Sequence, residues 1–420
     1  MKRLGVLFLV VLLLAGCAKD GPVAPKEGRK SITVTESVEK SVKSLIPSSP
    51  KTIKQWPMAL QTGSNDRYHA LIEKDIREIQ PLKSVSVGKG TSDSALTLAG
   101  PVVADGMAYT LDGRFGLQKT DLNTGKKIAY NRLAPDRDTA GIGLALYRNK
   151  LYAVSADGLV IGMDLNGKEL WKRDLKTNLR SNPVIADGRL FLSSAHNELF
   201  ALNIRNGEEL WRYSGDKEVT VFFGLGTPAV WGNIVLMPTT NGRMNAFDVG
   251  TGVLVWTENM WSGRTFHPLL DMPHITASPV IENKTVYVVG NAGKTGAYRL
   301  DDGTRIFSTP IGGRETPMIS GNALFLISNR GQLTALNKKD GRPFWQTDLI
   351  SNDKKAVWFG PVAVNDSVIV VSSAGDIVFY EIKTGREYRR DKQDGFVKAP
   401  VIVNDMMLLL TQDGDLIRYQ

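Results

Sequence analysis

Residues 202–211 read LNIRNGEELW, and residues 248–256 read DVGTGVLVW. In both stretches a strand-like run leads into a glycine turn, and a tryptophan follows that glycine four positions later. The same turn recurs along the chain at Thr124-Gly125, Asn166-Gly167, Asn206-Gly207, Thr251-Gly252, Asp302-Gly303, Asp340-Gly341 and Thr384-Gly385. A short unit that recurs at a nearly constant spacing is typical of solenoids and propellers.

Most of these units open with a proline ahead of a β-rich run. The prolines are Pro101, Pro183, Pro228, Pro279, Pro317, Pro361 and Pro400, and Gly143-Leu144 fills the one gap in the series. Successive openings lie about 40 residues apart, which is the length of one four-stranded propeller blade. Asp-Gly pairs such as Asp105-Gly106 supply the positive φ angles of tight hairpins between the strands. The sequence therefore predicts an all-β fold, an eight-bladed β-propeller over residues 82–420.

Large aromatic residues recur at one phase of the repeat, and they are Trp171, Trp211, Trp256, Phe307 and Trp345. Rings of this size are expected to pack as wedges between neighbouring blades, because each buries a large apolar area. Ala129 and Arg389 occupy the equivalent positions of two other units. Those two seams are therefore expected to be packed differently.

The last unit contains three of the four strands that a blade needs, because the chain ends at Gln420. Residues 82–87 alternate apolar and polar side chains just ahead of the first blade, which is the pattern of a strand. We expect this N-terminal strand to complete the last blade and close the ring, which removes two exposed sheet edges.

The N-terminus has the three parts of a signal peptide, namely a basic start, an apolar run and small residues before Cys17. We expect residues 1–16 to be removed and Cys17 to carry fatty chains that hold the protein on a membrane. Residues 17–50 are polar and are expected to form a flexible tether. In the leading stretch 51–81, Ile72, Ile76 and Ile79 have helical spacing, which predicts at most a short amphipathic helix over 67–80.

The formal net charge is +9, with 52 basic and 43 acidic residues and no dense basic cluster. This favours acidic surfaces weakly and does not indicate a nucleic acid as partner.

The glycine-and-tryptophan phrase resembles the tryptophan-docking repeat of quinoprotein-type propellers. Together with the leucine-alanine-glycine-cysteine signal, the tether and the closing strand, it resembles the BamB family of propeller lipoproteins in the machinery that assembles β-barrels in the outer membrane. The resemblance implies a scaffold without catalysis or cofactor that docks on the periplasmic domains of the barrel-forming core subunit. It also implies anchorage at the outer membrane, facing the periplasm. Ala18, which follows the cysteine, agrees with this, because an aspartate at that position would suggest retention at the inner membrane. By analogy with other proteins that bind at sheet edges, a second expected role is to receive unfolded barrel strands by edge pairing.

The resemblance also selects candidate partner-binding residues. The longest spacing, from Pro228 to Pro279, matches an enlarged connector that carries an acidic contact in that family, and Asp271 lies there. The loop where the family carries an arginine has none in this sequence. Phe222, Phe223 and Arg264 are the candidates to replace that arginine.

Two other functions remain open. A quinone-dependent dehydrogenase would need a planar cofactor, Ca²⁺ held by carboxylate and amide oxygens, and a carboxylate base, and many such enzymes also have adjacent cysteines. Cys17 is the only cysteine in the sequence. A surface adhesin or polysaccharide binder could use Trp261 on an exposed loop. His267, Asp271 and His274 are interpreted as solvated or interface residues and not as a metal site, because their stretch contains two prolines and reads as a loop.

Overall fold

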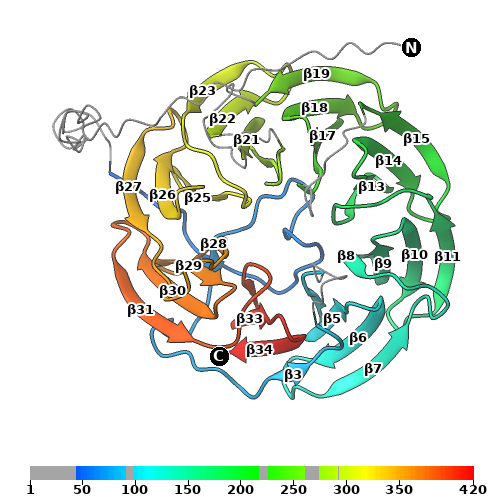
Figure 1. The fold of residues 1–420 in the computed structure, drawn as a ribbon, viewed down its shortest axis with the longest axis horizontal. Coiled ribbons are helices and arrows are strands. Elements are labelled where there is room, and N and C mark those ends of the chain that lie inside the picture. Colours follow the sequence, from blue (N-terminus) through cyan, green and yellow to red (C-terminus); the bar gives the residue numbers. More distant parts are fainter. Residues whose placement is uncertain (1–43, 91–98, 217–225, 261–273, 292) are drawn as a thin grey trace, which may run out of the picture. The chain divides into compact units, whose positions relative to one another are not determined.

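The repeats fold as β-meanders, each with neighbouring strands joined by hairpin turns. The computed structural model describes residues 44–90, 99–216, 226–260, 274–291 and 293–420. In this part of the chain the strands form eight sheets, which Figure 1 shows arranged radially in a ring. We number the sheets 1 to 8 in chain order of their main strands.

Sheets 1 to 4 form the first half of the ring. Sheet 1 contains β4 (Val102–Ala104), β5 (Met107–Leu111), β6 (Gly116–Asp121) and β7 (Lys127–Arg132). Sheet 2 contains β8 (Gly141–Tyr147), β9 (Lys150–Ser155), β10 (Leu159–Asp164) and β11 (Glu169–Asp174). Sheet 3 contains β12 (Val184–Ala186), β13 (Arg189–Ser193), β14 (Glu198–Asn203) and β15 (Glu209–Ser214). Sheet 4 contains β16 (Ala229–Trp231), β17 (Ile234–Pro238), β18 (Arg243–Asp248) and β19 (Leu254–Asn259).

The second half of the ring continues the series. Sheet 5 contains β20 (Val280–Glu282), β21 (Thr285–Gly290), β22 (Lys294–Arg299) and β23 (Arg305–Thr309). Sheet 6 contains β24 (Met318–Ser320), β25 (Ala323–Ile327), β26 (Gln332–Asn337) and β27 (Pro343–Asp348). Sheet 7 contains β28 (Trp358–Val364), β29 (Ser367–Ser372), β30 (Asp376–Glu381) and β31 (Glu387–Lys392), with β1 (Lys51–Thr52) and β2 (Ala70–Leu71) added to it. Sheet 8 contains β3 (Val85–Ser86), β32 (Val401–Val403), β33 (Met406–Leu410) and β34 (Asp415–Tyr419).

The prediction of an all-β propeller is confirmed. The uniform four-stranded unit holds for seven of the sheets in the described residues, whereas sheet 7 has six strands. The difference arises because β1 and β2 pair in parallel and Ala70 of β2 pairs with Val364 of β28. Buried apolar side chains fill the gaps between neighbouring sheets, as in the cluster that joins Phe191 of sheet 3 to Phe247 of sheet 4.

Tryptophans at the predicted phase join four of the sheets to the next one in the ring. The indole nitrogen of Trp256 on β19 donates to the backbone carbonyl of Leu300 in sheet 5 at 2.7 Å. The ring lies so close to Gly303 that a Cβ there would come within 2.9 Å of it. Gly303 also has a φ of 72°, so this turn requires glycine for both backbone and space. The same bond joins Trp171 to Ile204, Trp211 to Val249 and Trp345 to Ile382.

The expected closing strand is present. Val85 of β3 pairs with Leu416 of β34 in antiparallel register. Backbone hydrogen bonds from Leu82 to Arg418 and from Val87 to Gly414 extend the contact on both sides. The N-terminal strand therefore supplies the fourth strand of sheet 8, as predicted.

The two seams beside this closing strand use arginine, whereas four other seams use tryptophan. Arg418 donates to the backbone carbonyl of Leu122 in sheet 1. Arg389 donates to the carbonyls of Ile76 and Ile79 at 2.9 and 2.8 Å, and it is held by Asp391. The sequence expectation that the Arg389 seam is packed differently is confirmed.

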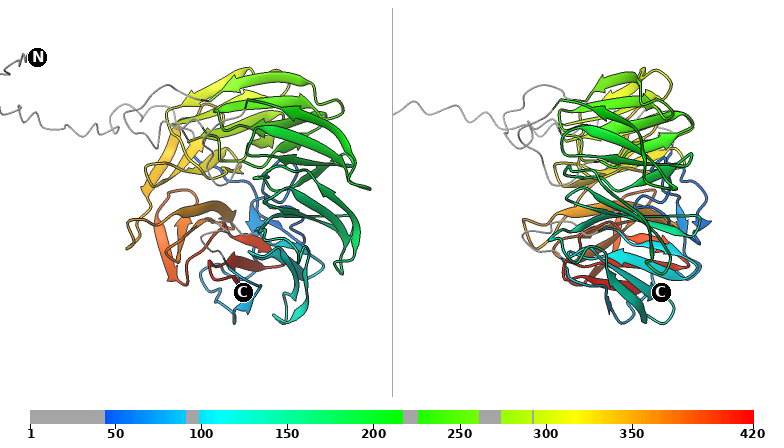
Figure 2. Two further views of the ribbon diagram at one scale, coloured as in Figure 1. Left: turned by 45° about the vertical axis from the view of Figure 1, so that its right-hand side comes forward. Right: turned by 90° about the vertical axis from the view of Figure 1, so that its right-hand side faces the viewer.

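Residues 44–81 form a capping segment that runs along one face of the ring, shown in blue in Figure 2. Its backbone bonds to the inner strands or turns of seven sheets; the bonded pairs are Trp56–Val103, Pro57–Leu146, Gly63–Val230, Ser64–Ile281, Ile46–Asn322, Ala70–Asn365 and Ile53–Asn404. Met58 packs against the clusters on both sides of sheet 3. Packing begins ahead of the boundary predicted at residue 50, since Leu45 is buried.

The helix predicted over 67–80 is wrong. That stretch contains β2 and turns, and its three isoleucines are buried against sheets 7 and 8. Their spacing is imposed by the inner strands that they cover, a tertiary effect that overrides periodicity. Within the residues that the structure describes, no helix is long and apolar enough to cross a membrane.

Candidate functional site

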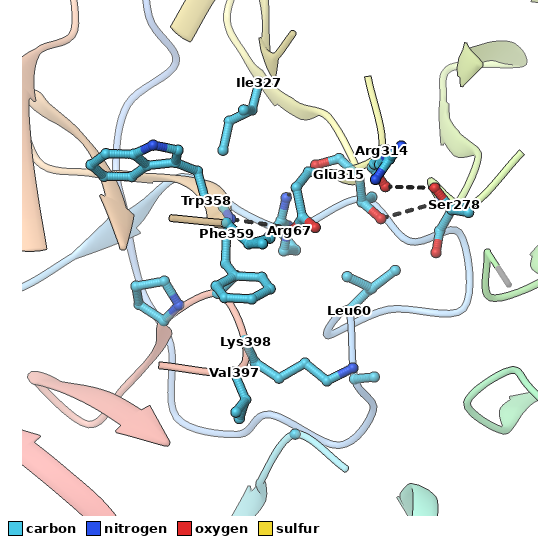
Figure 3. Close-up of a pocket in the computed structure, with 18 of the residues that line it drawn as sticks. Leu60, Arg67, Ser278, Arg314, Glu315, Ile327, Trp358, Phe359, Val397 and Lys398 are labelled. Atoms are coloured by element: carbon cyan, nitrogen blue, oxygen red, sulfur yellow. Dashed lines mark hydrogen bonds between the residues drawn. The ribbon is translucent and has the colours of Figure 1, made fainter. Parts of the chain in front are cut away.

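A cavity of about 590 Å³ lies on the axis of the ring. Trp56, Leu60 and Arg67 of the capping segment form part of its wall. The rest of the wall comes mainly from the residues that precede the inner strands of the sheets, and Figure 3 labels ten of the lining residues. Because every sheet directs its inner strand toward the axis, the chemistry of this cavity depends on the few positions just ahead of those strands.

The position two residues before the repeat proline supplies three of the large side chains that line the cavity. In sheets 6, 7 and 8 this position holds Glu315, Phe359 and Lys398, all of which line the cavity. In the other units that have the proline, it holds small residues, namely Ala99, Ser181, Gly226 and Ala277. The large and charged side chains are therefore concentrated on the side of the axis next to sheets 6 to 8.

Arg67 reaches this cavity from the capping segment. Its side chain is buried, and a guanidinium nitrogen donates to the backbone carbonyl of Thr316 at 3.1 Å and weakly to that of Pro317 at 3.5 Å. Burial lowers the pKa of Arg67 to about 10, against the opposing effect of Glu315 and Asp66. The guanidinium therefore remains charged at neutral pH. Among the described residues its Nε atom has no hydrogen-bond partner.

Glu315 and Lys398 place one negative and one further positive charge in the cavity. Burial raises the pKa of Glu315 to about 7, although Lys398, the amide of Gly360 and Arg67 all lower it. Burial also lowers the pKa of Lys398, while Glu315 raises it. Lys398 extends along the cavity toward Leu60 (Figure 3). The two groups thus stabilise one another's charge inside a partly dehydrated space.

The remaining wall is both basic and aromatic. Arg314 is exposed and donates from Nε to the side chain of Asn291 at 2.9 Å. Trp358 is 8% exposed, and with Phe359 it provides flat apolar surface. The described lining therefore combines three cationic groups, one carboxylate and the large rings of Trp56, Trp358 and Phe359.

These residues do not fit a quinone cofactor with its calcium ion. A calcium site needs six to eight oxygen ligands, usually with several carboxylates. Glu315 is the one acidic residue among the described residues that line the cavity, and three cationic groups share the space with it. Across the described ranges, no group of three histidine, cysteine, aspartate or glutamate residues is placed to hold a metal ion.

The residues predicted for the partner and the membrane all lie outside the described residues. Phe222 and Phe223 fall in the chain between β15 and β16, Arg264 and Asp271 fall between β19 and β20, and Cys17 precedes residue 44. The candidate metal stretch is described at His274 alone, which is buried. The predictions for the partner and the lipid therefore remain untested, whereas His274 is buried and not solvated as expected.

The sequence interpretation missed the axial residues. Glu315, Phe359 and Lys398 were detectable, because each breaks a run of small residues at a fixed repeat position. Arg67 had no such signal, since it lies outside the repeats and reaches the axis through the path of the capping segment.

Comparisons with known proteins agree with the repeat pattern. The family model described as outer membrane protein assembly factor BamB matches residues 112–347. A protein of Rickettsia conorii described as uncharacterised is 24% identical over 359 residues, which cover 82% of this chain and 84% of that protein. The outer membrane protein assembly factor BamB of Yersinia pestis is 23% identical over 329 residues, covering 76% of this chain and 82% of that protein.

Two solved structures illustrate how widely the fold is shared. BamB from Moraxella catarrhalis aligns with a TM-score of 0.69 and 17% identity, over 81% of this chain and 99% of that one. The quinohemoprotein alcohol dehydrogenase from Comamonas testosteroni aligns with the same TM-score and 14% identity, over 87% of this chain and 80% of that one. At these identities the likeness shows the fold, which hosts both kinds of protein.

Proposed function

This chain belongs to the family of the outer membrane protein assembly factor BamB, and from that premise we propose that it is a non-enzymatic scaffold of the machinery that assembles β-barrel proteins in the outer membrane. The observation that carries the proposal is the family match across the repeats from residue 112 to residue 347. Its partner is then the barrel-forming core subunit, contacted through that subunit's periplasmic domains.

The axial cavity supports the non-catalytic part of the proposal. A quinone-dependent dehydrogenase needs a carboxylate-rich cation site and a carboxylate base beside its cofactor. The described lining of this cavity offers Glu315 alone, facing Arg67 and Lys398. The Glu315 carboxylate interacts with these two cationic groups and is therefore poorly suited to bind calcium.

If the protein is anchored to the membrane, a small docking surface is sufficient to bind its partner. We propose that Cys17 carries the lipid, that residues 17–43 serve as the tether and that the propeller faces the periplasm. A tethered domain meets a partner on the same membrane at a high effective concentration, so that modest contacts give high occupancy. The palmitate or other fatty chains on Cys17 can be detected by mass spectrometry of the intact mature protein.

Docking is assigned to the two connectors that flank sheet 4, through Phe222 and Phe223 in one and Arg264 and Asp271 in the other. If Asp271 forms an ionic contact with the core subunit, the Asp271→Lys variant should co-purify with that subunit at least about tenfold less well, since charge reversal adds repulsion to the lost attraction. The matched control is Asp136→Lys, which reverses an exposed aspartate in the sheet 1 to sheet 2 connector. Equal recovery with both variants would remove Asp271 from the docking surface.

Deletion of the gene, followed by quantification of the membrane proteins, tests the function. Loss of an assembly scaffold should deplete outer-membrane β-barrels as a class. Loss of a dehydrogenase should leave those proteins at normal levels and abolish one oxidation activity, and loss of an adhesin should change attachment alone. Either of the last two outcomes would contradict the proposal.

A further inference from the structure

We propose that the axial cavity is a binding site for a small organic anion with a flat apolar body, such as an aromatic carboxylate. The inference goes beyond the scaffold function and does not depend on it. It rests on the charge of the cavity, the fixed position of Arg67 and the aromatic wall beside sheet 7.

The charges of the described lining are unbalanced. In the described lining, Arg67 and Lys398 share the space with a single carboxylate, that of Glu315. Cationic groups in a partly dehydrated space are stabilised by a counter-charge, and Glu315 can satisfy one of them. A bound anion would supply the missing negative charge.

Arg67 is fixed before any ligand arrives. Its guanidinium donates to the carbonyls of Thr316 and Pro317, and the preceding Asn65 donates from Nδ2 to Thr227, Pro228 and Pro279 at 3.0 to 3.1 Å. The capping segment is thus attached to the residues that lead into sheets 4, 5 and 6, at Asn65 and at the arginine itself. A guanidinium held in this way loses little conformational entropy when it binds a carboxylate.

The apolar wall determines the shape of the ligand. Trp358 and Phe359 contribute large rings, and Leu60 and Val397 contribute aliphatic surface. Pockets for small molecules are mostly apolar with a few placed polar groups, and they range from about 300 to 1,000 Å³. The axial cavity, at about 590 Å³, has the volume for a fused two-ring compound with its carboxylate.

Glu315 makes the site sensitive to pH. Burial raises its pKa to about 7, while Lys398, the Gly360 amide and Arg67 oppose that shift. Below that pH the carboxyl is neutral and no longer competes with an anion for the cations. Affinity for an anion should therefore rise as the pH falls from 8 to 6, and the Glu315→Gln variant should lose this dependence and bind more tightly at pH 8.

The test uses 2-naphthoate and its neutral counterpart 2-naphthamide in calorimetric titrations of the full-length protein in detergent. We expect 2-naphthoate to bind at one saturable site at least about tenfold more tightly than 2-naphthamide at pH 6. The Lys398→Gln variant should weaken 2-naphthoate binding at least about fivefold. The matched control, Lys383→Gln, changes an exposed lysine of the sheet 7 hairpin and should leave binding unchanged.

The outcomes separate the proposal from non-specific binding and from misfolding. Absence of saturable 2-naphthoate binding, equal affinity for the two compounds, or equal effects of the two lysine changes would each overturn it. Because Lys398→Gln could disturb the fold, the Glu315→Gln variant provides an independent test through a gain of affinity at pH 8. Unaltered affinity and an unaltered pH profile in that variant would also contradict the proposal.

Discussion

The guanidinium of Arg418 donates a hydrogen bond to the backbone carbonyl of Leu122, although 296 positions separate the two residues. Leu122 directly follows the third strand of sheet 1, at the place equivalent to that of Leu300 in sheet 5. Leu300 accepts its bond from the indole of Trp256, so Arg418 performs at the closing seam the task that tryptophan performs elsewhere. Arginine takes the place of tryptophan at this seam because the outer strand of sheet 8 is the closing strand β3, which is short and carries no tryptophan.

Arg418 is therefore expected to stabilise the closed ring. The Arg418→Ala variant should lose about 1.5–3 kcal/mol of stability, because a buried carbonyl loses a charged donor. Thermal unfolding of this variant should be compared with that of Arg330→Ala, which removes an exposed arginine from a sheet 6 turn. Equal midpoints for the two variants would show that the seam does not depend on Arg418.

Two substitutions of Trp256 should separate the contribution of the indole hydrogen bond to stability from that of packing. Trp256→Phe keeps a ring between sheets 4 and 5 and should cost roughly 1 kcal/mol for the lost hydrogen bond, plus a smaller packing term. Trp256→Ala should cost about 3–5 kcal/mol, since it also opens a cavity. Phe307 shows that a phenyl ring is accommodated at this phase, where it lies against Gly341. Denaturant unfolding of the two variants measures the difference, and similar losses would contradict the packing argument.

Asn65 should hold the capping segment over the axis. The Asn65→Ala variant removes the donor shared by three backbone carbonyls, so we expect a loss of about 1–3 kcal/mol and faster proteolytic cleavage within residues 44–81. The control is Asn352→Ala, which shortens an exposed side chain between sheets 6 and 7. Cleavage at the same rate in both variants would mean that Asn65 does not secure the segment.

Asp66 should give the protein a stability that declines toward alkaline pH. Burial, and secondarily Glu282, raises its pKa from 3.8 to about 7 against the effects of Lys338, Arg67 and Lys51. The folded state then binds more protons than the unfolded state between about pH 4 and 7, so this carboxyl favours folding at low pH and loses that contribution as the pH rises through 7. The Asp66→Asn variant should show a smaller loss of thermal stability between pH 5 and pH 8 than the unmodified protein. An identical change in both would contradict the assignment.

The repeats could be predicted from the sequence because the residues that mark each repeat lie close together along the chain. The turn at Gly252 and the ring at Trp256 lie four positions apart, and together they determine a hairpin and a seam. Closure through residues 82–87 was predictable because the last unit lacks a strand. The capping segment was not predictable, since Ile72, Ile76 and Ile79 take their places from strands of sheets 7 and 8 that are about 300 residues away.

The candidate site residues fall into the same two groups, those that the repeat makes predictable and those that it does not. Glu315 and Lys398 were readable from one repeat position, once that position was known to face the axis. The partner-binding residues Phe222, Phe223, Arg264 and Asp271 rest on the resemblance to a family and fall in connectors outside the described residues. Connectors carry partner specificity with little constraint from the repeat, so periodicity gives no information about them.

Affinity purification of the protein from gently solubilised membranes tests the scaffold proposal most directly. The account predicts that the barrel-forming core subunit of the assembly machinery is recovered with it in near-stoichiometric amount, and that a variant with Cys17→Ser recovers much less because it is no longer tethered. Recovery of the intact, membrane-bound propeller without that subunit would contradict the account.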